Sequence, residues 1–138
     1  MGRGALKSLP CVGVGGATQV FWLERQDEPD QVCYRVHLCN PPVASDEFYE
    51  AVFTLETERA RQQRMNAPQV YYRGKGIPEA VIRHAAADLD VVVCSCSNRA
   101  GQDEVRTDAA TKVWDRLVKA GDARYDRGRD RYHLFRGA

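Results

Sequence analysis

A basic, glycine-rich segment stands where a strand is expected to give way to a helix, Arg73-Gly-Lys-Gly76-Ile-Pro78. Glycine allows backbone amides to come close to a ligand. The first turn of a helix carries N–H groups that lack intrahelical acceptors, and the helix dipole adds positive potential there. Arg73 and Lys75 add formal positive charge. The segment therefore predicts an anion site that suits a diphosphate. The plainer interpretation is a tight surface turn followed by a helix.

The elements that must position this segment follow from hydrophobic periodicity. Val81, Ala85 and Leu89 share one face of an expected helix, and the apolar run DVVVCS is typical of a strand buried on both faces. Gly121 suits the end of a second helix. The elements expected in this half are a strand at 69–72, a helix at 78–87, a strand at 90–95, a loop at 97–106, a helix at 108–120 and a hairpin with strands at 123–125 and 132–135.

The N-terminal half begins with a glycine-rich stretch, residues 1–16, which is expected to be a flexible lead-in. Two strands, 19–26 and 32–39, flank a cluster of turn residues and are therefore expected to form an antiparallel hairpin. Asn40-Pro-Pro42 ends the second strand, because proline cannot donate to a sheet ladder.

A helix is expected over 46–64. Ser45 is a suitable N-cap, and acidic residues follow it in the first turn, where the helix dipole favours them. Phe48, Val52 and Leu55 fall at helical spacing. The half of the chain before the glycine-rich segment is thus expected to hold one hairpin and one helix.

Composition indicates the class of protein. The 138 residues, 43% of them hydrophobic, favour a single domain over 1–138 with one core. The pattern predicts an α+β fold with a mixed, mostly antiparallel sheet flanked by helices. With a net charge of +1, the protein as a whole has no strong electrostatic attraction to nucleic acid or anionic lipid. No apolar run reaches the roughly 20 residues of a membrane span, and residues 1–10 lack the apolar core of a signal peptide. We expect a cytoplasmic location without membrane contact.

The five cysteines lie mostly in apolar, strand-like stretches, as free buried thiols do in a reducing compartment. Cys33, His37 and Cys39 lie close in sequence, and Cys94 and Cys96 form a second pair. Structural zinc usually needs cysteine pairs two to four residues apart in tight turns. These spacings do not fit that pattern, so no metal site is expected.

The glycine-rich junction resembles the coenzyme-binding motif of the GCN5-related N-acetyltransferase (GNAT) family. That motif reads (Q/R)-x-x-G-x-(G/A) between a strand and a helix, and its amides hold the pyrophosphate of coenzyme A. Here Arg73 begins the motif, Gly76 keeps its glycine and Pro78 stands where a small residue is usual. Proline suits the first turn of a helix, although it offers no amide to a phosphate.

The resemblance extends downstream and covers roughly residues 70–125. The family follows with a helix, a buried strand and a helix carrying N-x-x-A-x-x-(L/F)-Y. This chain has the same spacing in Thr107-Asp-Ala-Ala110-Thr-Lys-Val113-Trp114. Thr107 takes the place of the asparagine, and Trp114 takes the place of a tyrosine that many members use as a general acid. Tryptophan cannot serve as that acid, and a core role for Trp114 is the plainer interpretation.

The resemblance implies an acetyl-CoA-dependent N-acyltransferase in which an amine attacks the acetyl carbonyl directly. The N-terminal half fits the family less well and would be an abbreviated version of it. A general base must remove the proton of the amine, and Glu47 is one carboxylate that could do so. Ser97 and Asn98, at the end of the expected buried strand, could orient the substrate or a water. The residues expected to contact the coenzyme are Val70, Tyr71, Tyr72, Arg73, Gly74, Lys75, Gly76, Ile77, Pro78, Thr107 and Trp114.

Two other functions stay open at this point. A catalytically inactive binding module on the same scaffold would explain Trp114 and Pro78, and it would act by contacting a protein or nucleic acid. Five arginines interleave with aromatic residues in the terminal hairpin, a pattern that can hold phosphates and stack bases, although three aspartates offset the charge. That hairpin could also form a homodimer. An ADP-ribosyltransferase, suggested by Arg73, Ser95-Cys-Ser97 and Glu104, fits worse because Gln102 stands where a second glutamate is expected.

Overall fold

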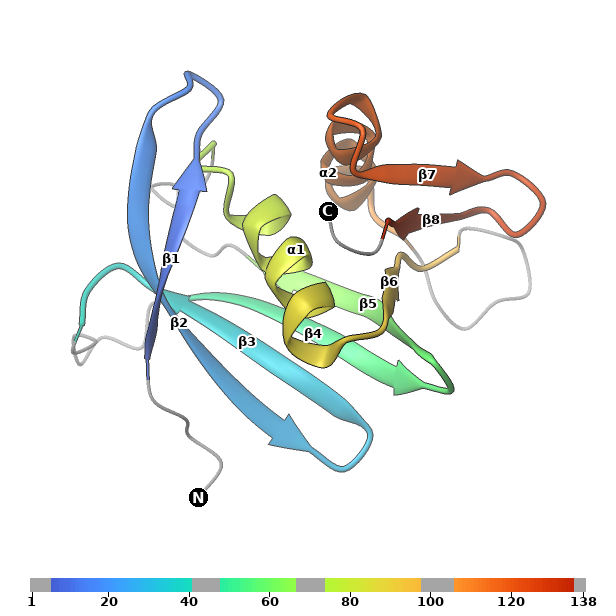
Figure 1. The fold of residues 1–138 in the computed structure, drawn as a ribbon, viewed down its shortest axis with the longest axis horizontal. Helices are drawn as coiled ribbons and strands as arrows, with labels where there is room; N and C mark the ends of the chain where they lie inside the picture. The colour runs from blue at the N-terminus through green and yellow to red at the C-terminus, as the bar shows by residue number, and fades with distance from the viewer. Residues whose placement is uncertain (1–5, 41–47, 67–73, 98–105, 136–138) are drawn as a thin grey trace.

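The protein is described by a computed structural model that covers residues 6–40, 48–66, 74–97 and 106–135. Within these segments eight strands form one sheet in the order β1-β2-β3-β4-β5-β6-β8-β7, with two helices packed against it (Figure 1). All neighbouring strands pair antiparallel except β5 and β6. The expected class, α+β with a mixed and mostly antiparallel sheet, is confirmed. No described helix is long and apolar enough to cross a membrane.

The observed helices and strands can be compared one by one with those predicted from the sequence. The first predicted hairpin, both predicted helices of the second half and the terminal hairpin are confirmed. The predicted strand at 69–72 lies outside the described residues. The elements are β1 Lys7–Val12, β2 Thr18–Glu28, β3 Gln31–His37, β4 Tyr49–Glu56, β5 Arg59–Asn66, α1 Ile77–Leu89, β6 Val92–Cys94, α2 Asp108–Lys119, β7 Ala123–Asp126 and β8 Arg131–Leu134.

The helix predicted over 46–64 is wrong, because β4 and β5 form an antiparallel hairpin there. Tyr49, Ala51 and Phe53 alternate into the core, a period of two that competes in the same sequence with the helical spacing noted above. The turn carries Glu58 in the left-handed region at φ 63, and no glycine or asparagine marks it. Strand β5, RARQQRMN, is rich in helix formers, and pairing on both sides overrides that preference.

Strands β5 and β6 are joined by the only parallel pairing among the described strands. Arg59, Ala60 and Arg61 of β5 face Val92, Val93 and Cys94 of β6. Helix α1 provides the crossover between them, as parallel neighbours require. Beyond Arg61, β5 continues to Asn66 without a partner in β6. The two strands therefore part toward their C-terminal ends and leave an opening in the sheet.

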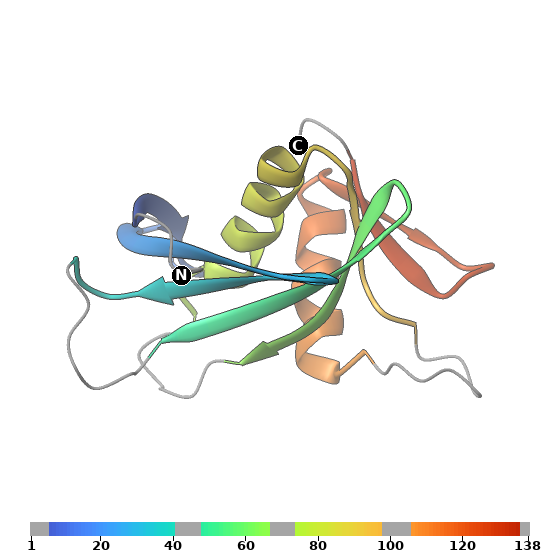
Figure 2. The same cartoon turned by 90° about the horizontal axis from the view of Figure 1, so that it is seen from below.

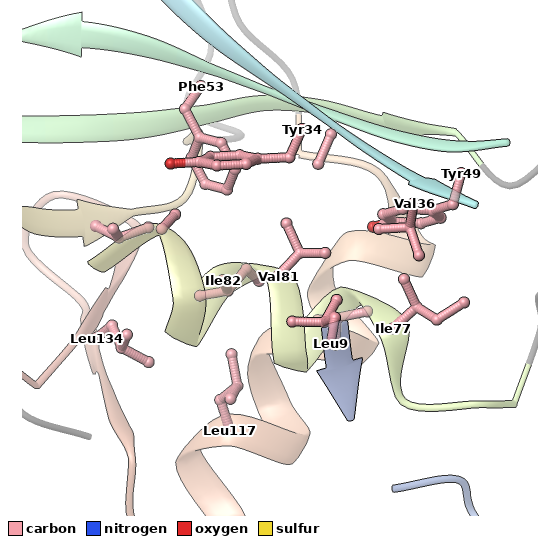
Figure 3. Packing of buried hydrophobic residues seen from close by; sticks show 14 of the residues in the cluster. Leu9, Tyr34, Val36, Tyr49, Phe53, Ile77, Val81, Ile82, Leu117 and Leu134 are labelled. Atoms are coloured by element: carbon pink, nitrogen blue, oxygen red, sulfur yellow. The ribbon is translucent and has the colours of Figure 1, made fainter. Parts of the chain in front are cut away.

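The core lies between the sheet and the helices. Strand residues from one face of the sheet and apolar residues of both helices belong to a single buried cluster. Figure 2 shows α1 along one side of strands β2–β5. In Figure 3, Ile77, Val81 and Ile82 of α1 lie between the strands and Leu117 of α2. An ion pair between Arg116 and Glu79 also joins the two helices, and Arg83 of α1 pairs at 2.6 Å with Asp122, which lies between α2 and β7.

Strand β1 corrects the expectation of a flexible lead-in, because Lys7–Val12 pairs along its length with β2. Its end packs backbone to backbone against the glycine-rich segment before α1. Val14 N–H donates to the Gly74 carbonyl at 3.0 Å, and a Cβ on Gly76 would lie 2.0 Å from the Val12 carbonyl oxygen. Gly76 also has φ 77 and is the N-cap of α1. Only glycine fits here, for reasons of both space and conformation.

This contact predicts a difference between two glycine substitutions. Gly76→Ala should lower the free energy of unfolding by at least about 2 kcal/mol, because it combines overpacking with a left-handed backbone. Gly15→Ala, in the adjacent turn with open space around its Cα, should change it by less than about 0.5 kcal/mol. Urea denaturation of both variants measures the difference. Equal stabilities would show that β1 does not pack on the segment as described.

Candidate functional site

The opening between β5 and β6 contains a hollow of about 80 Å³. Its wall combines the part of β5 beyond its pairing with β6, the chain after β6 and the first turn of α2. The residues that line it are Gln62, Gln63, Met65, Cys96, Arg106, Thr107 and Ala110. The hollow is therefore a product of the strand divergence, and it is bounded by polar side chains on several sides.

Gln62 receives two side-chain hydrogen bonds at the start of the opening, one on its backbone carbonyl and one on its side-chain amide. The Cys96 thiol donates to the Gln62 carbonyl at 3.1 Å. The Trp114 indole N–H donates to Gln62 Oε1 at 2.8 Å. Trp114 is fully buried and stacks on Tyr132, with ring centroids 6.0 Å apart. Burial raises the pKa of the Cys96 thiol, which is therefore held protonated and is a poor nucleophile.

Arg106 holds the other side of the hollow. Its guanidinium is buried, donates to the Cys96 carbonyl at 2.9 Å and to the Asp130 carbonyl at 3.0 Å, and pairs with the Asp130 carboxylate at 3.1 Å. A further bond reaches Thr111 Oγ1, and the group lies over the Tyr132 ring. A buried guanidinium needs such partners to offset its desolvation. Arg106 thus ties the chain after β6 to α2 and to the terminal hairpin.

A larger cavity, about 360 Å³, lies at the N-terminus of α1. The end of β1, the glycine-rich segment and one face of α2 enclose it. Lys112 and Arg116 of α2 contribute positive charge at its wall, and Glu79 of α1 contributes a carboxylate that Arg116 pairs with. Its lining residues are Val12, Gly13, Val14, Tyr49, Gly74, Gly76, Pro78, Glu79, Ala109, Lys112, Val113 and Arg116. The helix dipole adds positive potential at this end of α1.

Two of the residues that line this cavity carry a side-chain oxygen that lacks a hydrogen-bond partner among the described residues. The Tyr49 hydroxyl and Glu79 Oε1 are both shielded from solvent and accept or donate no hydrogen bond there. Burial, with Glu79 nearby, raises the pKa of Tyr49 well above its usual value and that of Cys11 to about 12. Both groups are therefore neutral. Buried polar atoms without partners are uncommon in native proteins, and they mark a place that a ligand could complete.

The two hollows flank the start of α2. Thr107 caps this helix by accepting from the Ala110 N–H at 3.1 Å, and it lines the smaller hollow together with Ala110. Ala109, the residue before, lines the larger cavity. An extended ligand that passes the first turn of α2 could therefore contact both.

Only some of the site residues predicted from the sequence line one of the two hollows. Gly74, Gly76 and Pro78 line the larger cavity, Thr107 lines the smaller hollow, and Lys75 lies between the two glycines. Ile77 and Trp114 are fully buried in the core. Ser97 is buried and donates to Asp130 at 3.4 Å. The remaining predicted residues, Glu47, Val70, Tyr71, Tyr72, Arg73 and Asn98, lie outside the described residues.

Sequence reasoning missed the residues that lie far apart in the chain. Gln62 and Tyr49 fall in the segment assigned to a helix, and no motif marks them. Lys112 and Arg116 are four residues apart on α2, a spacing that places them on one helical face and that could have been noticed.

A row of charged residues crosses the sheet on the face opposite the core. Glu24, Arg35 and Glu50 face one another on β2, β3 and β4, and Glu50 is paired in turn with the last residue of β5. Arg35 contacts Glu50 at 3.2 Å, and His37 Nε2 lies 3.0 Å from Glu24 Oε1. The row therefore ends at the side of the sheet where β5 and β6 part.

The terminal hairpin offers less to a nucleic acid than its sequence suggested. Tyr132 and His133 are buried, which leaves Tyr125 and Phe135 as its exposed aromatic residues. No group of three or more His, Cys, Asp or Glu residues in the described part of the chain stands close enough to hold a metal ion.

Comparison with known proteins finds no counterpart: the chain matches no protein-family model, no curated protein and no solved structure.

The unpartnered Tyr49 hydroxyl leads to a prediction with a matched control. Tyr49→Phe should raise the free energy of unfolding by about 1 kcal/mol, because it removes a buried hydroxyl without a partner. Tyr34→Phe should lower it by about 1–2 kcal/mol, because the Tyr34 hydroxyl donates to Asp88 at 2.7 Å. Urea denaturation compares the two. A destabilised Tyr49→Phe variant would mean that the Tyr49 hydroxyl has a partner in the free protein.

Proposed function

We propose that this protein binds an acyl-coenzyme A, with acetyl-CoA as the simplest candidate, and transfers the acyl group to an amine. The observation that carries the proposal is the parting of the parallel strands β5 and β6 beside a helix that begins at a basic, glycine-rich segment. Beyond Arg61, the side of β5 that faces the opening has no further strand partner among the described residues, which suits an extended ligand, and the helix start favours an anion. This pairing of features suits a ligand with a diphosphate at one end and an amide-containing arm at the other.

Each of the two hollows would hold a different part of that ligand. The diphosphate would lie in the larger cavity, near Gly74, Gly76 and the Lys112 ammonium, where charge and helix dipole both favour it. The arm would pass the first turn of α2, and the thioester would reach the smaller hollow between β5 and β6. The spacing resemblance of residues 73–78 and 107–114 to the GNAT family supports the same division.

The transfer needs no covalent intermediate on the protein. The nitrogen lone pair forms a bond to the acyl carbon, the carbonyl electrons move to oxygen, and collapse expels the thiolate of coenzyme A. The proton that the nitrogen loses balances the one that the sulfur gains. The buried, protonated Cys96 thiol is unsuited to accept the acyl group, which supports direct transfer.

A catalytically inactive coenzyme-binding module is the second candidate, and the position of Trp114 favours it. This residue is fully buried with its N–H bonded to Gln62, so it offers no proton to a departing thiolate. Binding without turnover would be the mark of such a module.

Calorimetric titration with acetyl-CoA tests the coenzyme site. Lys112→Glu should weaken binding at least about tenfold, because it reverses a charge beside the diphosphate. Lys119→Glu, the same charge reversal on the last turn of α2 and away from the cavity lining, should change affinity less than about twofold. A substitution of Gly76 is unsuitable for this test, because it would collide with Val12.

Turnover then separates the two candidates. The release of free coenzyme A thiol from acetyl-CoA is followed with a panel of amines, including polyamines, aminoglycosides and lysine peptides. Amine-dependent release identifies a transferase, whereas binding without release identifies the inactive module. Absence of binding at millimolar acetyl-CoA would refute both.

A further inference from the structure

The side-chain amide of Gln62 is a hydrogen-bond donor held in place without an acceptor. Gln62 is 5% exposed, and its Oε1 accepts from the Trp114 N–H at 2.8 Å. An indole N–H can only donate, so the amide oxygen must face Trp114 and the NH₂ group must face away. Its Nε2 is shielded from solvent and has no acceptor among the described residues. A buried donor of this kind is unfavourable in the free protein and favours a partner that can accept.

The neighbours of Gln62 in the hollow do not supply that acceptor. The Cys96 thiol already donates to the Gln62 backbone, and the Arg106 guanidinium is itself a donor with bonds to the Cys96 and Asp130 carbonyls. Thr107 Oγ1 accepts from the first turn of α2. The chemistry of the wall therefore calls for a small accepting group from outside, and a carbonyl oxygen has that character.

We propose that the Gln62 amide donates a hydrogen bond to the carbonyl oxygen of the bound acyl group, with Trp114 as the positioning residue that orients the amide. The inference rests on the proposed function, since it assigns the thioester end of the coenzyme to this hollow. The terminal torsion of glutamine is broad, so a small rotation turns the NH₂ toward the hollow while the bond to Trp114 is kept. The hollow, about 80 Å³, suits a short acyl group.

This bond would act on both binding and reaction. In the ground state it selects acetyl-CoA over free coenzyme A, which lacks the carbonyl. As the amine attacks, negative charge develops on the same oxygen, and a fixed donor in a site shielded from water stabilises that charge. Trp114 acts only through Gln62 and touches no reacting atom.

The test uses acetyl-CoA labelled with ¹³C at the carbonyl carbon. Bound to the wild-type protein, this carbon should resonate downfield of its position in free acetyl-CoA, as expected for a carbonyl that accepts a hydrogen bond. In Gln62→Glu, which still accepts from Trp114 but presents a carboxylate, most of that displacement should be lost. The affinity for acetyl-CoA should fall about tenfold, while that for coenzyme A should stay within about twofold.

Two further variants keep the test decisive. Gln19→Glu adds the same charge on β2, at a position that lines neither hollow, and it should keep the displacement. Trp114→Phe combined with Gln62→Met removes donor and acceptor together, which limits the loss of stability, and it should abolish the displacement.

The outcomes separate this inference from the function on which it rests. If acetyl-CoA binds and the carbonyl resonance stays displaced in both Gln62 variants, the assignment of Gln62 is wrong and the coenzyme site stands. If the wild-type protein binds acetyl-CoA with no displacement, the assignment also fails. If no binding is detected, the proposed function fails and this inference fails with it.

Discussion

The short parallel ladder between β5 and β6 is the constraint on which the rest of the structure depends. It joins the antiparallel strands β1–β5 to the C-terminal part of the chain, and a parallel pair requires the crossover that α1 provides. The ladder makes the sheet continuous, but its pairing ends at Arg61 and Cys94, so the two strands separate beyond these residues. Side chains then complete the boundary, with the Cys96 thiol and the Arg106 guanidinium bonded where further backbone pairs would otherwise lie. A longer ladder would make a more regular sheet and remove the hollow.

Buried polar side-chain atoms in this protein differ in how fully their hydrogen bonds are satisfied. Toward the C-terminal end of α1, Tyr34 and Asp88 form a complete network with Arg25. At the other end, the Tyr49 hydroxyl and one oxygen of Glu79 lack partners among the described residues, and so does the Gln62 amide nitrogen near the opening. Gln26 and His133 also carry a buried side-chain atom without a hydrogen-bond partner among the described residues, and they line neither hollow. Where such an atom does lie beside a hollow, it lowers the stability of the free protein and offers a group that a ligand can engage.

The second half of the fold could be predicted because its signals are local. The run DVVVCS, the apolar face of 78–87 and the helix end marked by Gly121 each follow from a few adjacent residues. Strand β5 could not be predicted, because RARQQRMN favours a helix by propensity and becomes a strand only through its neighbours on both sides. The candidate site divides in the same way. The glycine-rich segment is visible as a motif, whereas Gln62 and Tyr49 acquire their surroundings only when distant elements meet.

The placement of the cysteines gives the molecule a built-in reporter. All five lie in described segments, and Cys39 alone is exposed, while Cys11, Cys33, Cys94 and Cys96 are buried. Burial raises the pKa of each of these four thiols, so they are both inaccessible and protonated. A thiol-specific reagent would therefore modify the folded chain once and the unfolded chain at every cysteine. The buried thiols lie on β1, on β3, at the end of β6 and at Cys96, two residues beyond β6. The order in which they become reactive would therefore reveal which part of the sheet opens first.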